Sequence, residues 1–71
     1  MPRDDLVQME GEVVRTLPDG RFRVEVRGAH QVLCSLAGRL RYRVSVSRGD
    51  RVEIEVSRHD VGRGRIVNRL D

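Results

Sequence analysis

The chain has 71 residues, of which 35% are charged, and its formal net charge is +3. A chain of this length is expected to form one small domain with a compact core, without room for a deep substrate cavity beside it. No acidic residue occurs from residue 26 to 49, which favours a polyanionic partner. A membrane surface is not favoured, because no amphipathic helix with apolar anchors is present. All 14 basic residues are arginine, which suits RNA binding but is interpreted mainly as the composition of a GC-rich genome.

Alternating apolar residues predict five short strands, which begin with LVQMEGEVV (residues 6–14). The turn LPDG leads to RFRVEVR (residues 21–27), and the turn RGAH leads to HQVLCSL (residues 30–36), which alternates less cleanly. The turn SRGD precedes RVEIEVS (residues 51–57). A polar loop, RHDVGRG, is then expected before GRIVNRL (residues 64–70) closes as the fifth strand. The residues expected to face inward are Val7, Met9, Gly11, Val13, Phe22, Val24, Val26, Val52, Ile54 and Val56.

Residues 37–44 interrupt this pattern. Leu36, Leu40 and Val44 fall at i, i+4 and i+8, which suits one or two helical turns, whereas a strand would place the arginines of this segment on one face. The sequence leaves both possibilities open. The layout as a whole predicts an all-β fold, a five-stranded OB-fold barrel with a short helix between strands 3 and 4, in a single S1-like RNA-binding domain over residues 1–71.

No group of residues in the chain is typical of catalysis or metal binding, so neither an enzyme nor a cofactor nor a metal site is expected. Glu53 and Glu55 share one strand face and are interpreted as solvent-facing residues that pair with arginines across the sheet. Cys34 is single and is expected to be a small buried hydrophobe. The N-terminal MPRDDL contains no signal peptide or membrane span, which indicates a cytoplasmic protein.

The two aromatic residues limit the mode of RNA binding. Phe22 falls on the inward face of its strand and is expected in the core, while Tyr42 lies among arginines and could either stack on a base or pack. Binders of unstructured single strands usually present several aromatic side chains on one face. The pattern therefore favours docking onto a structured RNA, whose backbone and shape are read.

Four motifs, taken in order, resemble the bacterial translation initiation factor one family. MEGEVVRTLPDGRFRVEV is similar to its N-terminal half, GRLR to its G-K-M-R, GDRV to its G-D-K-V, and GRIVNR to its closing G-R-I-V-x-R. The resemblance spans the whole chain. The segment CSLAGRLRYRVSVSRGD is one residue shorter than the bacterial pattern and has the spacing of the archaeal and eukaryotic counterpart, which indicates a divergent member.

The resemblance implies a non-catalytic, monomeric initiation factor that binds the small ribosomal subunit at the decoding (A) site. It would contact 16S ribosomal RNA and a neighbouring ribosomal protein, and support the other two bacterial initiation factors. The residues implied in RNA binding are Arg39, Arg41, Arg65 and Arg69, with Tyr42 and Arg43 placed to reach a base. Two alternatives remain: a free-standing OB-fold RNA-binding protein or RNA chaperone, and a protein-interaction module with an acidic partner.

Overall fold

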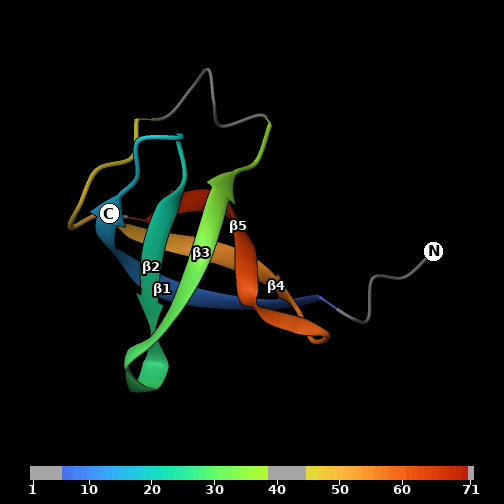
Figure 1. Cartoon of the computed structure of the whole chain (residues 1–71). Helices are drawn as coiled ribbons and strands as arrows, with labels where there is room; N and C mark the ends of the chain where they lie inside the picture. The colour runs from blue at the N-terminus through green and yellow to red at the C-terminus, as the bar shows by residue number, and fades with distance from the viewer. Residues whose placement is uncertain (1–5, 39–44, 71) are drawn as a thin grey trace.

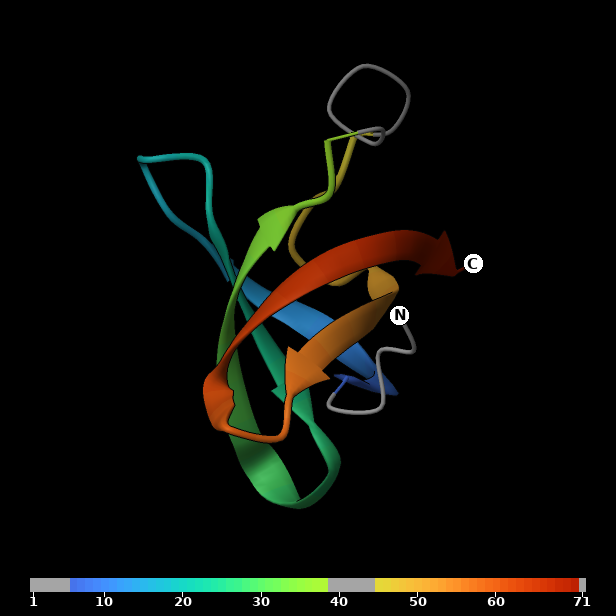
Figure 2. The ribbon, with the colours of Figure 1, turned by 90° about the vertical axis from the view of Figure 1, so that its right-hand side faces the viewer.

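The computed structural model describes residues 6–38 and 45–70. The strands within them are β1 (Leu6–Thr16), β2 (Phe22–Val26), β3 (His30–Leu36), β4 (Arg51–Ser57) and β5 (Asp60–Leu70). They close into a barrel in the order β1-β2-β3-β5-β4 (Figure 1), and only β3 and β5 pair in parallel. Figure 2 shows the same barrel after a 90° turn, with the antiparallel strands β4 and β5 side by side. The predicted all-β, five-stranded OB-fold barrel is confirmed.

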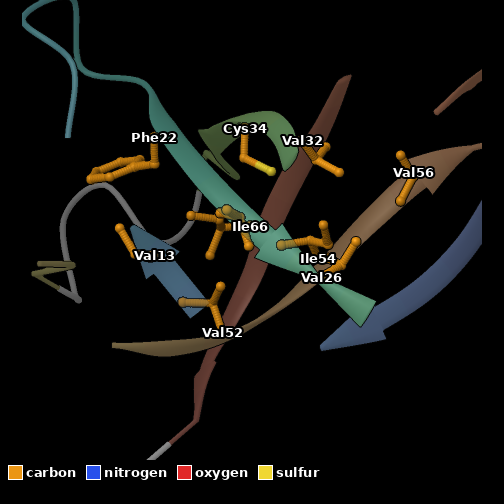
Figure 3. Close-up of a cluster of buried hydrophobic side chains, with 10 residues drawn as sticks. Val13, Phe22, Val26, Val32, Cys34, Val52, Ile54, Val56 and Ile66 are labelled. Carbon is orange, nitrogen blue, oxygen red and sulfur yellow. The ribbon is translucent and has the colours of Figure 1, made fainter. Parts of the chain in front are cut away.

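The interior of the barrel is filled by alternate side chains of all five strands (Figure 3). Ile54, Ile66 and Val52 have no exposed surface, and each fully buried side chain of this kind contributes about 1.5–3 kcal/mol to folding. The core predicted from the alternation is confirmed in β2 and β4, and in β1 at Gly11 and Val13, whereas Val7 and Met9 are half-buried. The complete buried set is Val13, Phe22, Val24, Val26, Val32, Cys34, Val52, Ile54, Val56 and Ile66.

Strand β1 serves two neighbours because it bends. Its first half pairs with β4 and its second half with β2, and the register with β2 shifts between Val13 and Arg15. Such a bulge increases local bending and twist, as closure of a small barrel requires. At Gly11 the strands approach so closely that a Cβ atom would lie 2.6 Å from Val24 Cγ1 and 2.7 Å from the Glu25 carbonyl oxygen. Only glycine fits there without displacement of the neighbouring strand.

The predicted turns are present, and hydrogen bonds and an ion pair between their own residues stabilise them. In the first turn the Gly20 amide donates to the Leu17 carbonyl at 3.1 Å, and the Arg21 side chain lies 2.7 Å from Asp19. The hydrogen bond from Arg21 lowers the pKa of Asp19. In the turn that precedes β4, the Ser47 amide donates to Asp50 Oδ2 at 2.9 Å.

One detail of the sequence prediction differs from the structure, and another falls mostly on residues outside the described ones. The short helix expected between strands 3 and 4 falls on residues outside the described ones, and the helical turn that the structure describes is a 3-10 turn, η1 (Arg27–Ala29), between β2 and β3. The loop expected over residues 58–64 is wrong in part, because β5 already begins at Asp60. The β4–β5 register shifts between Val56 and Ser57. This irregularity lets the polar and glycine residues that follow Asp60 form the first part of β5. In the described part of the chain, no helix has the length and apolarity needed to span a membrane.

Candidate nucleic-acid interface

Two of the six residues predicted to bind RNA lie in the described part of the chain, and both belong to β5. This strand is held on both sides, parallel to β3 and antiparallel to β4, so the directions of its side chains are fixed by pairing. Arg65 and Arg69 are both exposed. The other four lie outside the described residues, and their role stays a prediction: Arg39, Arg41, Tyr42 and Arg43.

Arg65 projects from the outer face of the barrel and pairs across the sheet with Glu55. Its Nη2 atom lies 3.3 Å from Glu55 Oε1, and the Arg65 side chain is 52% exposed. An exposed ion pair of this kind contributes only about 0–1 kcal/mol, so the guanidinium can exchange the carboxylate for a phosphate. The expected cross-sheet pairing with arginine is confirmed for Glu55.

Arg69 joins the end of β5 to the segment that precedes β4. Its Nη1 atom donates a hydrogen bond of 2.9 Å to the carbonyl oxygen of Ser45. Arg69 follows the irregularity at which the β4–β5 register skips a residue, and it lies opposite Val52. The guanidinium therefore has a structural contact at the margin of the segment that carries the four remaining predicted residues.

A row of outward-facing residues that the sequence analysis did not single out crosses four strands. Arg15 of β1 lies opposite Arg23 of β2, Arg23 lies opposite Leu33 of β3, and Leu33 lies opposite Arg63 of β5. We call these four residues the arginine row. Among the described residues, none of its three arginines forms an ion pair. The row could not be found from spacing along the chain, because it depends on the register of three strand pairs.

The wall formed by β2, β1 and β4 carries the opposite charge. Glu12 lies opposite Glu25, and Glu10 lies opposite Glu53. We call these four residues the acidic patch. Arg51 contacts it, with Nη2 3.2 Å from Glu10 Oε1. The patch borders a hollow of about 1110 Å³ at the end of the barrel where β2 turns into β3.

The two histidines and the single cysteine have ordinary structural surroundings. The Nε2 atom of His30 lies 3.2 Å from the Val61 carbonyl oxygen, and the backbone amide of His59 donates to Ser57 Oγ at 3.1 Å. Cys34 is buried in the core as expected, and burial raises the pKa of its thiol to about 12. Within residues 6–38 and 45–70, no three His, Cys, Asp or Glu side chains gather in a way that could hold a metal ion.

Known proteins resemble this chain in sequence and in structure. The family model described as translation initiation factor 1A / IF-1 matches residues 1–71. The solution structure of the bacterial translation initiation factor one from the Wolbachia endosymbiont strain TRS of Brugia malayi superposes with a TM-score of 0.78 at 36% identity, covering 94% of this chain and 80% of that one. YjeQ from Thermotoga maritima superposes with a TM-score of 0.73 at 28% identity, covering 92% of this chain but 23% of that one.

The family match extends over the same residues that carry the four motifs, and the structural match covers most of the chain. The resemblance predicted from GRLR, GDRV and GRIVNR is thereby confirmed. An OB-fold barrel with arginines on its outer wall is also a typical RNA-binding scaffold. The chain therefore belongs to the translation initiation factor 1A / IF-1 family, whose members are RNA-binding proteins of protein biosynthesis.

Proposed function

We propose that this factor binds the small ribosomal subunit at the decoding (A) site through 16S rRNA and blocks premature entry of tRNA. The family match over residues 1–71 carries the proposal. The protein would act in the cytoplasm as a monomer, with the barrel as its RNA-binding domain. It would contact a neighbouring ribosomal protein and support the other two initiation factors. In this proposal the protein catalyses no reaction and acts by occupying the decoding site.

The roles of the individual residues follow from charge and position. Arg65 would release Glu55 and contact an rRNA phosphate, while Arg69 would support the segment after residue 44 and contact phosphate from the end of β5. The arginines at 39 and 41 would supply further phosphate contacts. Tyr42 and Arg43 would reach a base. Arginine suits all these contacts, since its planar guanidinium binds phosphate through two parallel hydrogen bonds.

Sedimentation with purified small subunits, followed by chemical footprinting of the 16S rRNA, tests the proposal. We expect co-sedimentation and protection of decoding-site nucleotides. The Arg65→Gln variant should lower the affinity and reduce the slope of log K against log salt by about 0.7–0.9, the value for one lost phosphate contact. Arg27→Gln is the matched control, because Arg27 is exposed in η1 and has no ion pair among the described residues. Binding without decoding-site protection would refute the assignment of the site.

The alternative of a binder of unstructured RNA is less well supported. Phe22, one of only two aromatic residues, is 8% exposed and belongs to the core. Stacking platforms on single strands need accessible rings, so Tyr42 alone would have to serve. A tighter affinity for a single-stranded oligonucleotide than for the intact subunit would favour this alternative. Binding to an acidic protein that survives ribonuclease would instead favour a protein-interaction module.

A further inference from the structure

We propose that the first half of β1 is an open strand edge, to which an extended basic segment of a partner protein adds as a further strand. The stretch concerned is residues 6–11, and it borders the hollow at the end of the barrel. We call it the open edge. The inference goes beyond the proposed function, because it assigns a protein-binding surface and does not depend on RNA binding.

Strand β1 changes its neighbours at Glu12. From Leu6 to Glu12 it pairs with β4, whereas it pairs with β2 only from Glu12 to Thr16. Between residues 6 and 11, the side of β1 that faces away from β4 therefore has no strand partner within the described part of the chain. Unpaired edges of this kind are templates for the addition of another strand.

The alternation of the backbone identifies the groups that the open edge offers. The Val13 amide donates to the Asp50 carbonyl at 2.9 Å, and the Val13 carbonyl accepts from the Gly49 amide at 2.7 Å. Val13 thus directs both groups to the side of β4. Consecutive residues of an antiparallel strand direct these groups to opposite sides, so Gln8 and Glu10 direct theirs away from β4. They present two donors and two acceptors beside the hollow, which both residues line.

The hollow supplies apolar contacts next to this edge. Met9, Val26 and Val56 line it, and Met9 packs against the core of the barrel. Val61 also lines the hollow and is a large hydrophobic residue that the described part of the chain leaves 55% exposed. With a volume of about 1110 Å³, the hollow has room for several side chains. Apolar residues of an added strand would lose contact with water there, which favours binding.

The charges around the open edge favour a basic occupant. Glu10 and Glu12 project from the outer face of β1, and Glu25 lies opposite Glu12 on β2. Among the described residues, Glu10 pairs with Arg51, while the other two carboxylates form no ion pair. A basic side chain directly opposite Glu10 in an added strand would be stabilised. A second copy that added its β1 would instead bring like charges together, and the phosphates of RNA would be repelled.

The period of a strand specifies the sequence of the partner segment. Its outward residues would be basic and stand beside Glu10, and the residues between them would be apolar and enter the hollow. The open edge is about 20 Å long, so about six residues cover it. In strand addition of this kind, main-chain hydrogen bonds supply affinity and alternate side chains supply specificity.

The probe is a synthetic peptide of alternating arginine and valine, about seven residues long, added to the full chain without RNA. Amide hydrogen exchange reports on the edge directly. Gln8 and Glu10 should exchange rapidly in the free protein and slowly with the peptide, whereas Met9, which pairs with Ile54 of β4, should exchange slowly in both states. An alternating glutamate–valine peptide is the charge control and should not bind.

Two methylated peptides test whether a strand is added. One carries N-methyl groups on its arginine amides and the other on its valine amides, so both keep the charge and the side chains of the probe. In an added strand, amides of one kind face β1 and those of the other kind face away. One methylated peptide should therefore lose binding while the other keeps it.

Two protein variants complete the test. Gln8→Pro removes an N–H that is directed to the open edge and not to β4, so it should lower the peptide affinity about tenfold or more and leave the melting temperature nearly unchanged. Glu10→Gln should lower the affinity about two- to fivefold, the value for one exposed charge pair. Asp19→Asn is its matched control, because it removes one charge at the first turn, and it should leave the affinity unchanged. If Gln8→Pro fails to fold, the methylated peptides still decide, since they act on the unmodified protein.

The other possible occupants give different results. Slow exchange of Gln8 and Glu10 in the free protein at every concentration would mean that the chain itself covers the edge. Slowing that increases with protein concentration, together with a dimer in sedimentation, would mean that a second copy does. Each of these results overturns the inference, as would equal binding of the two methylated peptides or no binding of the arginine–valine peptide. Because ribosomes are absent from these measurements, a failure of subunit binding would refute the proposed function and leave this inference standing.

Discussion

The arginine row and the acidic patch are built in the same way with opposite charges. Each places like charges directly opposite one another, Arg15 against Arg23 in the row and Glu12 against Glu25 in the patch. The two surfaces share β1 and β2, and the change of sign occurs within two residues of the same strand, between Arg23 and Glu25. The net charge of +3 conceals this segregation, because it adds the two surfaces together.

The surfaces differ in their counter-charges. The acidic patch has a cation in Arg51, which pairs with Glu10, whereas the row has no acidic partner within the described residues. A polyanion approaching the barrel is attracted by one wall and repelled by the other, so the patch restricts the orientations in which RNA can dock. Charge on this small barrel therefore serves the orientation of a bound polyanion as well as its affinity. Three sets of variants test the difference between the two walls.

The largest effect is expected at the two glycines that lie between the charged residues of each wall. Gly11 lies between Glu10 and Glu12, and an added Cβ atom would be 2.7 Å from the Glu25 carbonyl oxygen. Gly64 lies between Arg63 and Arg65, and its Cβ atom would be 2.9 Å from the Glu55 carbonyl oxygen. Overpacking against backbone costs about 1–3 kcal/mol. Urea unfolding should show Gly11→Ala to be more destabilised than Gly64→Ala, and both more than the control Gly38→Ala, where nothing lies within 4 Å.

These glycine variants also separate the two walls by function. At a temperature where both are folded, Gly64→Ala should weaken RNA binding more than Gly11→Ala, because it displaces the backbone that carries two arginines. Gly11→Ala displaces the wall with the acidic patch. Equal stability of Gly11→Ala and Gly38→Ala would contradict the close approach of β1 to β2. Equal RNA affinity of the two destabilised variants would contradict the functional difference between the walls.

Period-two alternation made much of this fold predictable, whereas the arrangement of charge needed the register. Phe22, Val24 and Val26 were placed inside correctly, because alternation along one strand is a local property of the sequence. The bulge before Arg15 and the early start of β5 at Asp60 were not predicted, since both arise from pairing with another strand. The arginine row was missed for the same reason. Of the predicted site, Arg65 and Arg69 could be placed, while the four residues between 39 and 43 lie outside the described part of the chain.

The second comparison uses one neutralising substitution on each wall. Glu25→Gln removes the repulsion with Glu12, and Arg15→Gln removes the repulsion with Arg23. Glu25 is chosen because its other cross-strand neighbour is the neutral Gln31, whereas Glu12 also lies opposite Arg51. Both substitutions should raise the free energy of unfolding by about 0.2–1 kcal/mol, with a smaller gain at high salt. Only Arg15→Gln should weaken RNA binding and lower its salt dependence, whereas Glu25→Gln should leave the salt slope unchanged. Urea unfolding and RNA titrations at two salt concentrations provide both measurements.

This pair distinguishes function from sheet stability. If Arg15 served only the fold, its substitution would change stability without a change in the salt slope for RNA. A loss of stability in Arg15→Gln would show that Arg15 and Arg23 do not repel one another as their register implies. In that event the row would lose the electrostatic reason for expecting an anion there.

The smallest effect is expected at Glu55 of β4, which lies opposite Arg65 of β5. Its carboxylate pairs with Arg65 and also accepts a hydrogen bond of 3.5 Å from Gln8 Nε2. Glu55→Gln should change the free energy of unfolding by less than about 1 kcal/mol, because the arginine is half exposed and such pairs are weak. The substitution should nevertheless raise the affinity for small subunits, since Arg65 no longer has to leave a carboxylate to reach phosphate.

Glu53→Gln is the matched control for Glu55→Gln. Glu53 lies on the same face of β4, opposite Asn68 of β5 and Glu10 of β1, and forms no ion pair among the described residues. Both variants remove one negative charge, so the general attraction to RNA rises equally. Any additional gain in Glu55→Gln measures the release of Arg65, and it should disappear in the Arg65→Gln background. Equal gains in the two variants would mean that Arg65 does not contact phosphate, and the RNA surface would then begin at the arginine row and not at Arg65 of β5.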